Sequence, residues 1–292
     1  MGVFLADTRR TTTDESATRS RQVIAVDGKA LKGSSHLGTP RRHLLSAVTH
    51  APVATLNQVE VSAKTNEVRH FKPLLSPLNL AGAVVTFDAL HSVKASITWL
   101  IETKKAHYIA VIKTSQPTAY AQLAALPWAD IAVQHSASQT RHGRRESRSI
   151  KTCAITDNLG GIAFPHAALA VRVHRRRKPA DKPESRENLY AVTSLDAHQA
   201  GPAALAAAIR GHWGIENSSH HIRDVTFAED ASTVHAGSAP RAMADGFRNL
   251  AIGILKLLGA ENIAKTTRAI RHDPEQALAI LGITNNPDYH GT

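Results

Sequence analysis

The first part of the chain alternates between short apolar runs and polar breaks, a pattern that predicts strands. Residues 23–26 are apolar and end at Asp27 and Gly28, which is typical of a buried strand that ends at a functional site. Two further strand-like runs follow at residues 43–49 and 54–61, with Pro52 between them. We expect these three runs to form an antiparallel meander.

The ending of the first strand recurs further along the chain. Residues 83–87 are again apolar and end at Asp88, which a small residue follows. A helical pattern over residues 92–104 and a strand-like run over residues 107–112 come next. This order predicts a parallel pair of strands joined by a right-handed crossover. The fold class predicted is therefore mixed α/β, a sheet with helices on its faces.

Residues 114–190 interrupt this order and are predicted to form a mostly β insertion. Within it, residues 169–173 are predicted to be a strand, and the basic run at residues 174–178 follows directly. That run has two interpretations. It is an exposed loop, or it contacts a phosphate backbone.

A helix is predicted to begin at Pro202, after the insertion. On helical spacing, one face carries His212, Glu216, His220, Arg223 and Phe227. Such a face is costly to bury unless a cation or a phosphate is bound there. The alternative is a solvated polar face with ion pairs along it. A second helix is predicted over residues 240–258, and its apolar side, with Met243, Leu250, Ile254 and Leu257, is expected to belong to the core.

The charge of the chain favours a polyanionic partner. Lys and Arg number 35 against 24 Asp and Glu, a formal net charge of +11, and nucleic acid is the usual partner of so basic a chain. A generally basic proteome is the alternative explanation. The single cysteine, Cys153, excludes an internal disulfide and a cysteine-based zinc ribbon. We expect a cytoplasmic, nucleoid-associated protein without a signal peptide.

Three acidic residues are candidates for one metal site. Asp27 and Asp88 end their strands in the same way, and Glu216 lies on the polar helix face. A strand-end Asp on its own is often a turn or cap residue. Two with matching contexts favour a shared site, in which carboxylate oxygens suit Mg²⁺ or Mn²⁺ and two such ions support in-line phosphoryl transfer. His212, His220 and Arg223 would then contact phosphate.

Five segments of the chain together resemble the DDE transposases of bacterial insertion sequences. They are AVDGKALKGS (25–34), VVTFDALHS (84–92), HGRRESR (142–148), HWGIEN…RDVTFAED (212–230) and APRAMADGFRNLAIGIL (239–255). More narrowly, the chain is similar to the ISAs-type group, allied to the IS-four-like superfamily. The resemblance runs from about residue 21 to residue 283.

The resemblance implies a ribonuclease-H-like core with the β-rich insertion placed before the last catalytic acidic residue. It implies that Asp27, Asp88 and Glu216 are catalytic and bind two Mg²⁺ or Mn²⁺ ions. The implied activity is strand cleavage and strand transfer on DNA, with element ends and target as partners and a homodimer assembled on them. DNA contacts are expected from Lys29, Lys32, Arg144, Arg175, Arg176, Arg177, His212, His220 and Arg223.

Some positions depart from the family patterns. The superfamily pattern Tyr-x2-Arg-x3-Glu-x6-Lys corresponds here to Ile209, His212, Glu216 and Arg223. The family's Lys-Gly-Asn-Gln sequence is Lys-Thr-Ser-Gln in this chain, at residues 113–116. Family members carry a helical N-terminal domain, where this chain has residues 1–20, predicted to be a disordered lead-in. A truncated copy is therefore expected. Its catalytic domain is predicted at residues 21–258, with a helical tail at residues 259–292.

Two other functions compete with transposition. The first is a basic DNA-binding remnant that no longer cleaves, in which the acidic residues are structural. The second is a host nuclease on the same fold, which would cleave DNA without joining strands.

Overall fold

A computed structural model of the chain describes residues 21–34, 41–61, 67–88, 94–141, 143–155, 161–232, 234 and 239–283. The predicted lead-in at residues 1–20 lies outside the described residues. None of the helices in these ranges is both long enough and apolar enough to span a bilayer.

The described strands form one nine-stranded sheet in the order β3-β2-β1-β4-β5-β9-β8-β7-β6. The first three strands are antiparallel, β1, β4 and β5 are parallel, and β5, β9, β8, β7 and β6 are antiparallel. The meander and the parallel β-α-β unit are therefore confirmed. The bounds are β1 (Val23–Leu31), β2 (Arg42–Thr49), β3 (Thr55–Val61), β4 (Val84–Asp88), β5 (His107–Ile112), β6 (His135–Arg141), β7 (Arg144–Ala154), β8 (Leu169–Pro179) and β9 (Ser185–Thr193).

One face of the sheet packs on three short helices, α2 (Phe71–Leu75), α3 (Lys94–Glu102) and α4 (Pro117–Ala124). A short 3-10 helix, Glu67–His70, leads into α2. Alternate residues of β1 and β4 point to this side, and Phe87 meets Phe71 edge-on with ring centroids 5.4 Å apart. Burial of these apolar side chains is the main stabilising contribution on this face.

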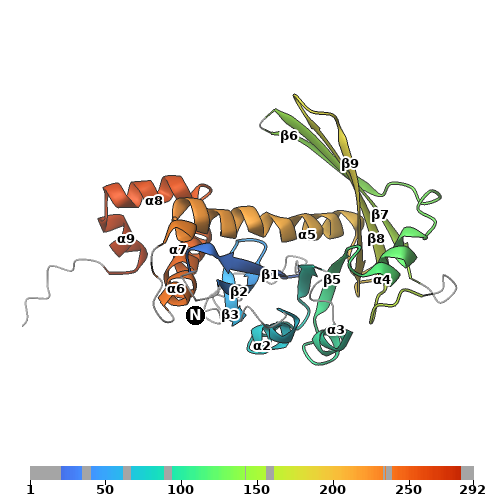
Figure 1. The fold of residues 1–292 in the computed structure, drawn as a ribbon, viewed down its shortest axis with the longest axis horizontal. Helices are drawn as coiled ribbons and strands as arrows, with labels where there is room; N and C mark the ends of the chain where they lie inside the picture. Colours follow the sequence, from blue (N-terminus) through green and yellow to red (C-terminus); the bar gives the residue numbers. More distant parts are fainter. Residues whose placement is uncertain are drawn as a thin grey trace, which may run out of the picture.

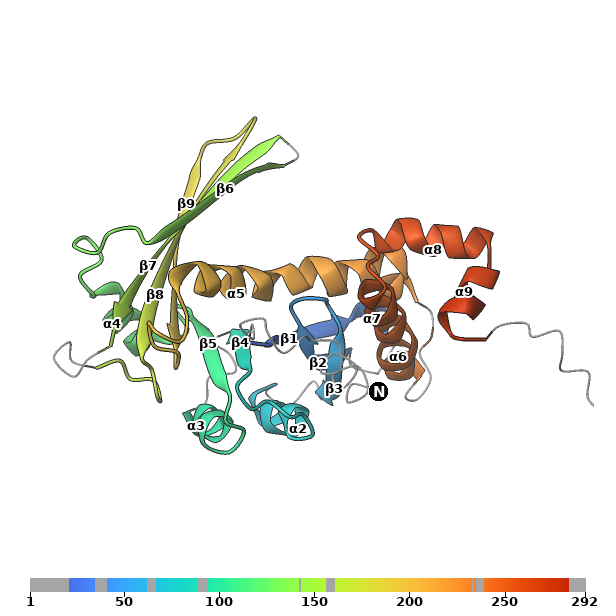
Figure 2. The same ribbon diagram turned by 180° about the vertical axis from the view of Figure 1, so that it is seen from behind.

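The opposite face of the sheet is covered by one helix, α5 (Pro202–Ile215), which crosses the strands (Figures 1 and 2). Leu205 and Ile209 of α5 pack with Val84 and Ile109, and Ile215 packs with Ala25. Because helices cover both faces of the parallel strands, these strands are almost continuously apolar. This mixed sheet with helices on both faces confirms the predicted ribonuclease-H-like fold class.

Strands β6 to β9 extend beyond the body of the molecule as a long twisted ribbon, the arm (Figure 1). They lie between β5 and α5 in the sequence, so the β-rich insertion is found where it was expected. The basic run at residues 174–178 belongs to β8 and pairs with both β7 and β9. The loop interpretation of this run is therefore wrong, because its backbone groups are used by two neighbouring strands.

After Ile215 the helical turns widen. Glu216–His220 and Ile222–Thr226 are π-helical, so the backbone N–H of His221 donates to the carbonyl of Glu216 and that of Phe227 donates to Ile222. Each π turn inserts a residue relative to the α-helical period and so rotates all following side chains. A 3-10 helix, Glu229–Ala231, follows.

The helix predicted over residues 240–258 is confirmed, but its buried stripe was misplaced. It consists of α6 (Ala239–Ala242), a π-helical stretch, Met243–Arg248, and α7 (Asn249–Leu257). The buried apolar residues are Ala244, Ile252 and Leu255, whereas the predicted Met243, Leu250, Ile254 and Leu257 are not buried. The π turn again shifts the helical phase. Helices α8 (Ile263–His272) and α9 (Glu275–Ile280) complete the described chain.

Candidate active site

Asp27 and Asp88 lie side by side on adjacent strands. Asp88 ends β4 as predicted, but the strand end predicted at Asp27 is wrong, because β1 stays paired with β2 and continues to Leu31. The parallel register of β1 and β4 pairs Val26 with Phe87, so the next position in the same register brings Asp27 opposite Asp88. Neighbouring strands are about 4.8 Å apart, and residues of equal parity point to the same face. Ala25 and Thr86, two residues earlier, face α5. Both aspartates therefore project to the side of the sheet that α5 covers.

The environment of Asp27 contains three more carboxylates. Burial raises the pKa of Asp27 to about 6, and the negative charges of Glu216, Glu67 and Asp88 add to the increase, while the backbone N–H of Gly28 opposes it. That N–H donates to Asp27 Oδ1 at 2.9 Å. Glu216 therefore lies close enough to Asp27 to affect its ionisation, although the two residues are far apart in the sequence.

Glu67 is a member of this acidic group that the sequence analysis missed. Its carboxylate packs against the backbone of Gly28, since a Cβ added to Gly28 would lie 2.6 Å from Glu67 Oε1. Glu67 comes from a short 3-10 helix, where the strand-end pattern gives no indication of a site. The available sequence signal was the glycine directly after Asp27, because glycine permits such a close approach.

Replacing Asp27 by Asn is expected to stabilise the fold at about pH 8 by on the order of 1–2 kcal/mol. A raised folded-state pKa means that ionisation of Asp27 disfavours the fold, a penalty that grows as pH rises from the ordinary value of 3.8 to about 6. The gain should therefore shrink toward zero at about pH 4. Urea unfolding at both pH values measures it, with the exposed Asp130→Asn as control. An Asn variant that is less stable at the higher pH would contradict this account of Asp27.

Asp88 is held by a cation of the chain itself. Lys113, directly after β5, forms an ion pair with Asp88 Oδ2, and 54% of the Lys113 side chain is exposed. Since Asp88 pairs with Val111 in the parallel register of β4 and β5, Lys113 projects to the same face as Asp88.

The donor set fits a hard divalent cation by its chemistry. Asp27, Asp88, Glu216 and Glu67 offer only carboxylate oxygens, which Mg²⁺ and Mn²⁺ prefer. Within the ranges that the structure describes, no three His, Cys, Asp or Glu side chains are already arranged to hold a metal ion. Ligation would therefore require rotation of these side chains, including the release of Asp88 from Lys113.

The side chains predicted to share one polar helix face do not share a face in the structure. His212 and Arg223 are buried, whereas Glu216 is exposed. The π turns explain the difference for Arg223, which lies beyond the first of them. Phe227 is half-buried.

His212 belongs to a buried polar chain beneath α5. Its Nδ1 lies 3.2 Å from Thr86 Oγ1, which in turn lies 3.1 Å from His50 Nε2. Burial, with a smaller effect of His212, lowers the pKa of His50 to about 4. The expectation that His212 contacts DNA is corrected, because its ring is used inside the protein between α5 and β4.

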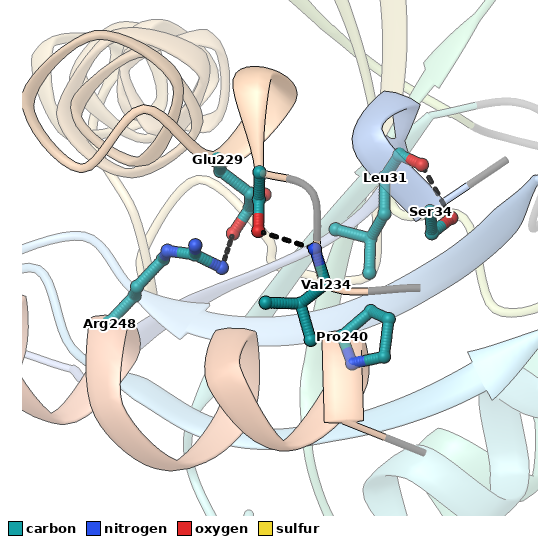
Figure 3. A pocket seen from close by; sticks show the side chains of 7 residues that line it. Leu31, Ser34, Glu229, Val234, Pro240 and Arg248 are labelled. Carbon is teal, nitrogen blue, oxygen red and sulfur yellow. Dashed lines mark hydrogen bonds and ion pairs between the residues drawn. The ribbon is translucent and has the colours of Figure 1, made fainter. Parts of the chain in front are cut away.

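Arg223 and Lys29, also expected at DNA, are buried in an internal ion network. Arg223 Nε donates to Glu229 Oε2 at 2.8 Å, and Arg223 is only 1% exposed. Lys29 Nζ lies 2.6 Å from Asp224 Oδ1 and 3.8 Å from Glu229 Oε1. Arg248 also reaches Glu229 Oε2, at 3.5 Å (Figure 3). These contacts attach the π-helical segment and α6–α7 to β1, the strand that carries Asp27.

His220 and Lys32 have different positions. His220 Nδ1 lies 3.7 Å from Asp27 Oδ2, and burial, Arg223 and Lys29 lower the pKa of His220 to about 3, so its ring faces Asp27 in the neutral form. Lys32 is exposed and pairs with Asp230 Oδ2 at 2.8 Å. Of the expected DNA contacts outside the arm, Lys32 is therefore the exposed cation.

The arm carries arginines on both of its faces. On the side that continues the face of α5, one buried carboxylate, Glu146, is surrounded by Arg144, Arg148, Arg175 and Arg177. Arg175 also lies 3.9 Å from Glu187, so four guanidinium groups meet two carboxylates and positive charge is in excess there. Glu184 pairs with Arg176 at 3.0 Å and with Arg186 at 2.8 Å. An open groove of about 280 Å³ on the arm is lined by Ser136, Ser147, Arg148, Ser149, His174, Arg176 and Arg186.

Several known proteins are similar to this chain in sequence. At 29% identity, 246 residues align with "Putative transposase YncI" of Escherichia coli O157:H7, covering 80% of this chain and 62% of YncI. At the same identity, 257 residues align with "H repeat-associated putative transposase YhhI" of Escherichia coli strain K12, covering 83% of this chain and 66% of YhhI. The chain thus spans about two thirds of the length of these relatives.

Among solved structures, a piggyBac transposase synaptic complex with hairpin DNA aligns with a TM-score of 0.46 and 12% identity, over 92% of this chain and 59% of that chain. The family described as "Transposase DDE domain" matches residues 18–243, which include Asp27, Asp88, Glu216 and the whole arm. Since this match covers more than half of the chain, the protein belongs to the family of transposases with a DDE domain.

Proposed function

We propose that this chain catalyses metal-dependent cleavage and strand transfer of DNA as the catalytic part of an insertion-sequence transposase of the ISAs-type group. The observation that supports this most strongly is the acidic group where the end of β4 meets the middle of β1. Asp27 and Asp88 occupy equivalent positions on adjacent parallel strands, and Glu216 approaches from the helix above them. Family membership alone would not indicate which residues act.

In this proposal Asp27, Asp88 and Glu216 hold two Mg²⁺ or Mn²⁺ ions through their carboxylate oxygens. Bound ions would activate the attacking water or 3′ hydroxyl and stabilise the departing oxygen. His220 lies beside Asp27 in the neutral form and so adds no competing positive charge there. The network around Glu229 fixes β1 against the π-helical segment, and so fixes Asp27 relative to Glu216.

DNA is the partner that the charge distribution supports. The arm presents an excess of guanidinium groups, and Lys32 adds an exposed cation directly after β1. Element ends and target would be held together by a homodimer on DNA. This oligomeric state follows from the proposed reaction and not from a surface of the chain.

Plasmid nicking by the purified protein tests the proposed activity. With Mg²⁺ or Mn²⁺ we expect conversion of supercoiled to open-circular DNA, and with Ca²⁺ we expect binding without cleavage. A strand-transfer assay with a 3′-hydroxyl donor should then yield joined products. Binding without nicking under any divalent ion would favour the DNA-binding remnant, and nicking without joining would favour a host nuclease.

Replacing Arg175, Arg176 and Arg177 by Gln should weaken DNA binding about equally for all sequences. The slope of log K against log salt should fall by roughly one unit for each phosphate that the variant no longer neutralises, because fewer counterions are released. Fluorescence anisotropy over a salt series measures this slope. The matched control removes the same charge from the exposed side chains Lys265, Arg268 and Arg271 of α8. If the arm variant keeps the wild-type slope, as the α8 control should, the arginines of the arm are not part of the interface.

A further inference from the structure

Lys113 lies where a cation would bind at Asp88. It is the second residue after Val111, the partner of Asp88 in the parallel register, so the two side chains leave adjacent strands on the same face of the sheet. The ammonium group pairs directly with Asp88 Oδ2. Strand pairing therefore brings these two side chains to the same face of adjacent strands.

The other cationic groups nearby are used elsewhere. Lys29 is held by Asp224 at 2.6 Å, and Arg223 is held by Glu229 at 2.8 Å. Lys32 pairs with Asp230. Within the described part of the chain, Lys113 is thus the lysine or arginine that forms an ion pair with one of Asp27, Asp88 and Glu216.

We propose that Lys113 is a built-in competitor for the metal, its ammonium occupying the ligand oxygen of Asp88 in the metal-free chain and leaving when a divalent cation binds. The inference rests on the proposed function, because it assumes that Asp88 is a metal ligand. Asp88 cannot give the same oxygen both to Lys113 and to a metal ion at full strength. The apparent metal affinity is therefore reduced by the fraction of molecules in which the ion pair is formed.

The exposure of Lys113 determines how large the change in metal affinity should be. The side chain is more than half exposed, 54%, and Asp88 is 24% exposed. Exposed ion pairs are weak, so the competition should change the affinity by about two- to fivefold and not by orders of magnitude. Lys113 would delay metal loading until the local concentration of divalent ions is sufficient, without preventing it.

Isothermal titration of the full chain with Mn²⁺ tests the inference without reference to activity. Lys113→Gln should bind Mn²⁺ about two- to fivefold more tightly than the wild type. Lys113→Arg keeps the charge and the pairing, so its affinity should equal that of the wild type or be lower. Lys105→Gln is the matched control, because it removes the same charge at the opposite end of β5. Asp88→Asn should abolish or strongly weaken the titration.

The outcomes of these titrations distinguish failure of the role of Lys113 from failure of the proposed metal site. Unchanged or weaker Mn²⁺ binding by Lys113→Gln, in a protein whose binding needs Asp88, overturns the role of Lys113 and leaves the proposed metal site intact. Equal tightening by Lys105→Gln also overturns it, because the effect would then be general electrostatics. No Mn²⁺ binding by the wild type or by Lys113→Gln overturns the proposed metal site, and the competitor role with it.

Discussion

The Glu216→Gln variant should lose DNA nicking by about a hundredfold or more while DNA affinity stays nearly unchanged. Gln keeps the size and hydrogen-bonding capacity of Glu but removes the negative charge that a site for two divalent ions needs. Glu216 is exposed, so the substitution should leave the fold intact. Affinity could rise slightly, because a negative charge that faces phosphate is removed. Plasmid nicking with Mn²⁺ and fluorescence anisotropy with Ca²⁺ measure the two quantities.

The same loss is expected for Asp27→Asn and Asp88→Asn, because the three carboxylates act as one unit and their effects should not add. The matched control is Glu261→Gln, an exposed glutamate between α7 and α8. Nicking that persists in Glu216→Gln at the wild-type rate would remove Glu216 from the site. Another carboxylate near Asp27, with Glu67 the first candidate, would then have to be tested.

The Glu229→Gln variant should lose about 3–5 kcal/mol of the free energy of unfolding. Glu229 is buried and is the shared partner of Arg223, Arg248 and Lys29. Removing its charge leaves cations in the interior without compensation, and such an uncompensated charge is far more costly than the absence of a surface pair. Urea unfolding followed by far-ultraviolet circular dichroism gives the value.

A half-exposed ion pair is the control for this effect. Glu60 accepts two hydrogen bonds from Arg42 at 2.9 Å, and Glu60→Gln should cost about 1 kcal/mol or less. If both glutamine variants lose similar small amounts, the Glu229 network does not fix β1 to the helical segments. Lys29 and Arg223 would then again be candidates for contacts outside the protein.

Much of the fold could be predicted because buried strands and helices leave a recognisable pattern of apolar residues in the sequence. The runs that end at Asp27 and Asp88 became adjacent parallel strands, since a continuous apolar run flanked by a helix has few other places in a sheet. The matching contexts correctly predicted that both aspartates lie together, although β1 does not end at Asp27 and continues to Leu31. The β-rich character of residues 114–190 was equally clear from its alternation of residues.

The other features of the fold and the site could not be predicted, because the spacing of apolar residues carries no information about them. The π turns after Ile215 are a local change of backbone hydrogen bonding, and they turned Arg223 toward Glu229 when a regular α-helix would have aligned it with Glu216. Glu67 comes close to Asp27 through tertiary packing alone. The basic run of β8 was taken for a loop because charge suggested exposure, whereas a strand in an arm is exposed and paired at once.

A crystal structure with DNA and Mn²⁺, with anomalous scattering used to locate the metal ions, tests the proposed metal site most directly. We expect two Mn²⁺ peaks about 3.5–4 Å apart, bound by carboxylate oxygens of Asp27, Asp88 and Glu216 next to the scissile phosphate. We also expect that the Lys113 ammonium has left Asp88. Peaks that lie away from these carboxylates, or a Glu216 that remains turned away from both aspartates with metal bound elsewhere, would contradict the proposed site.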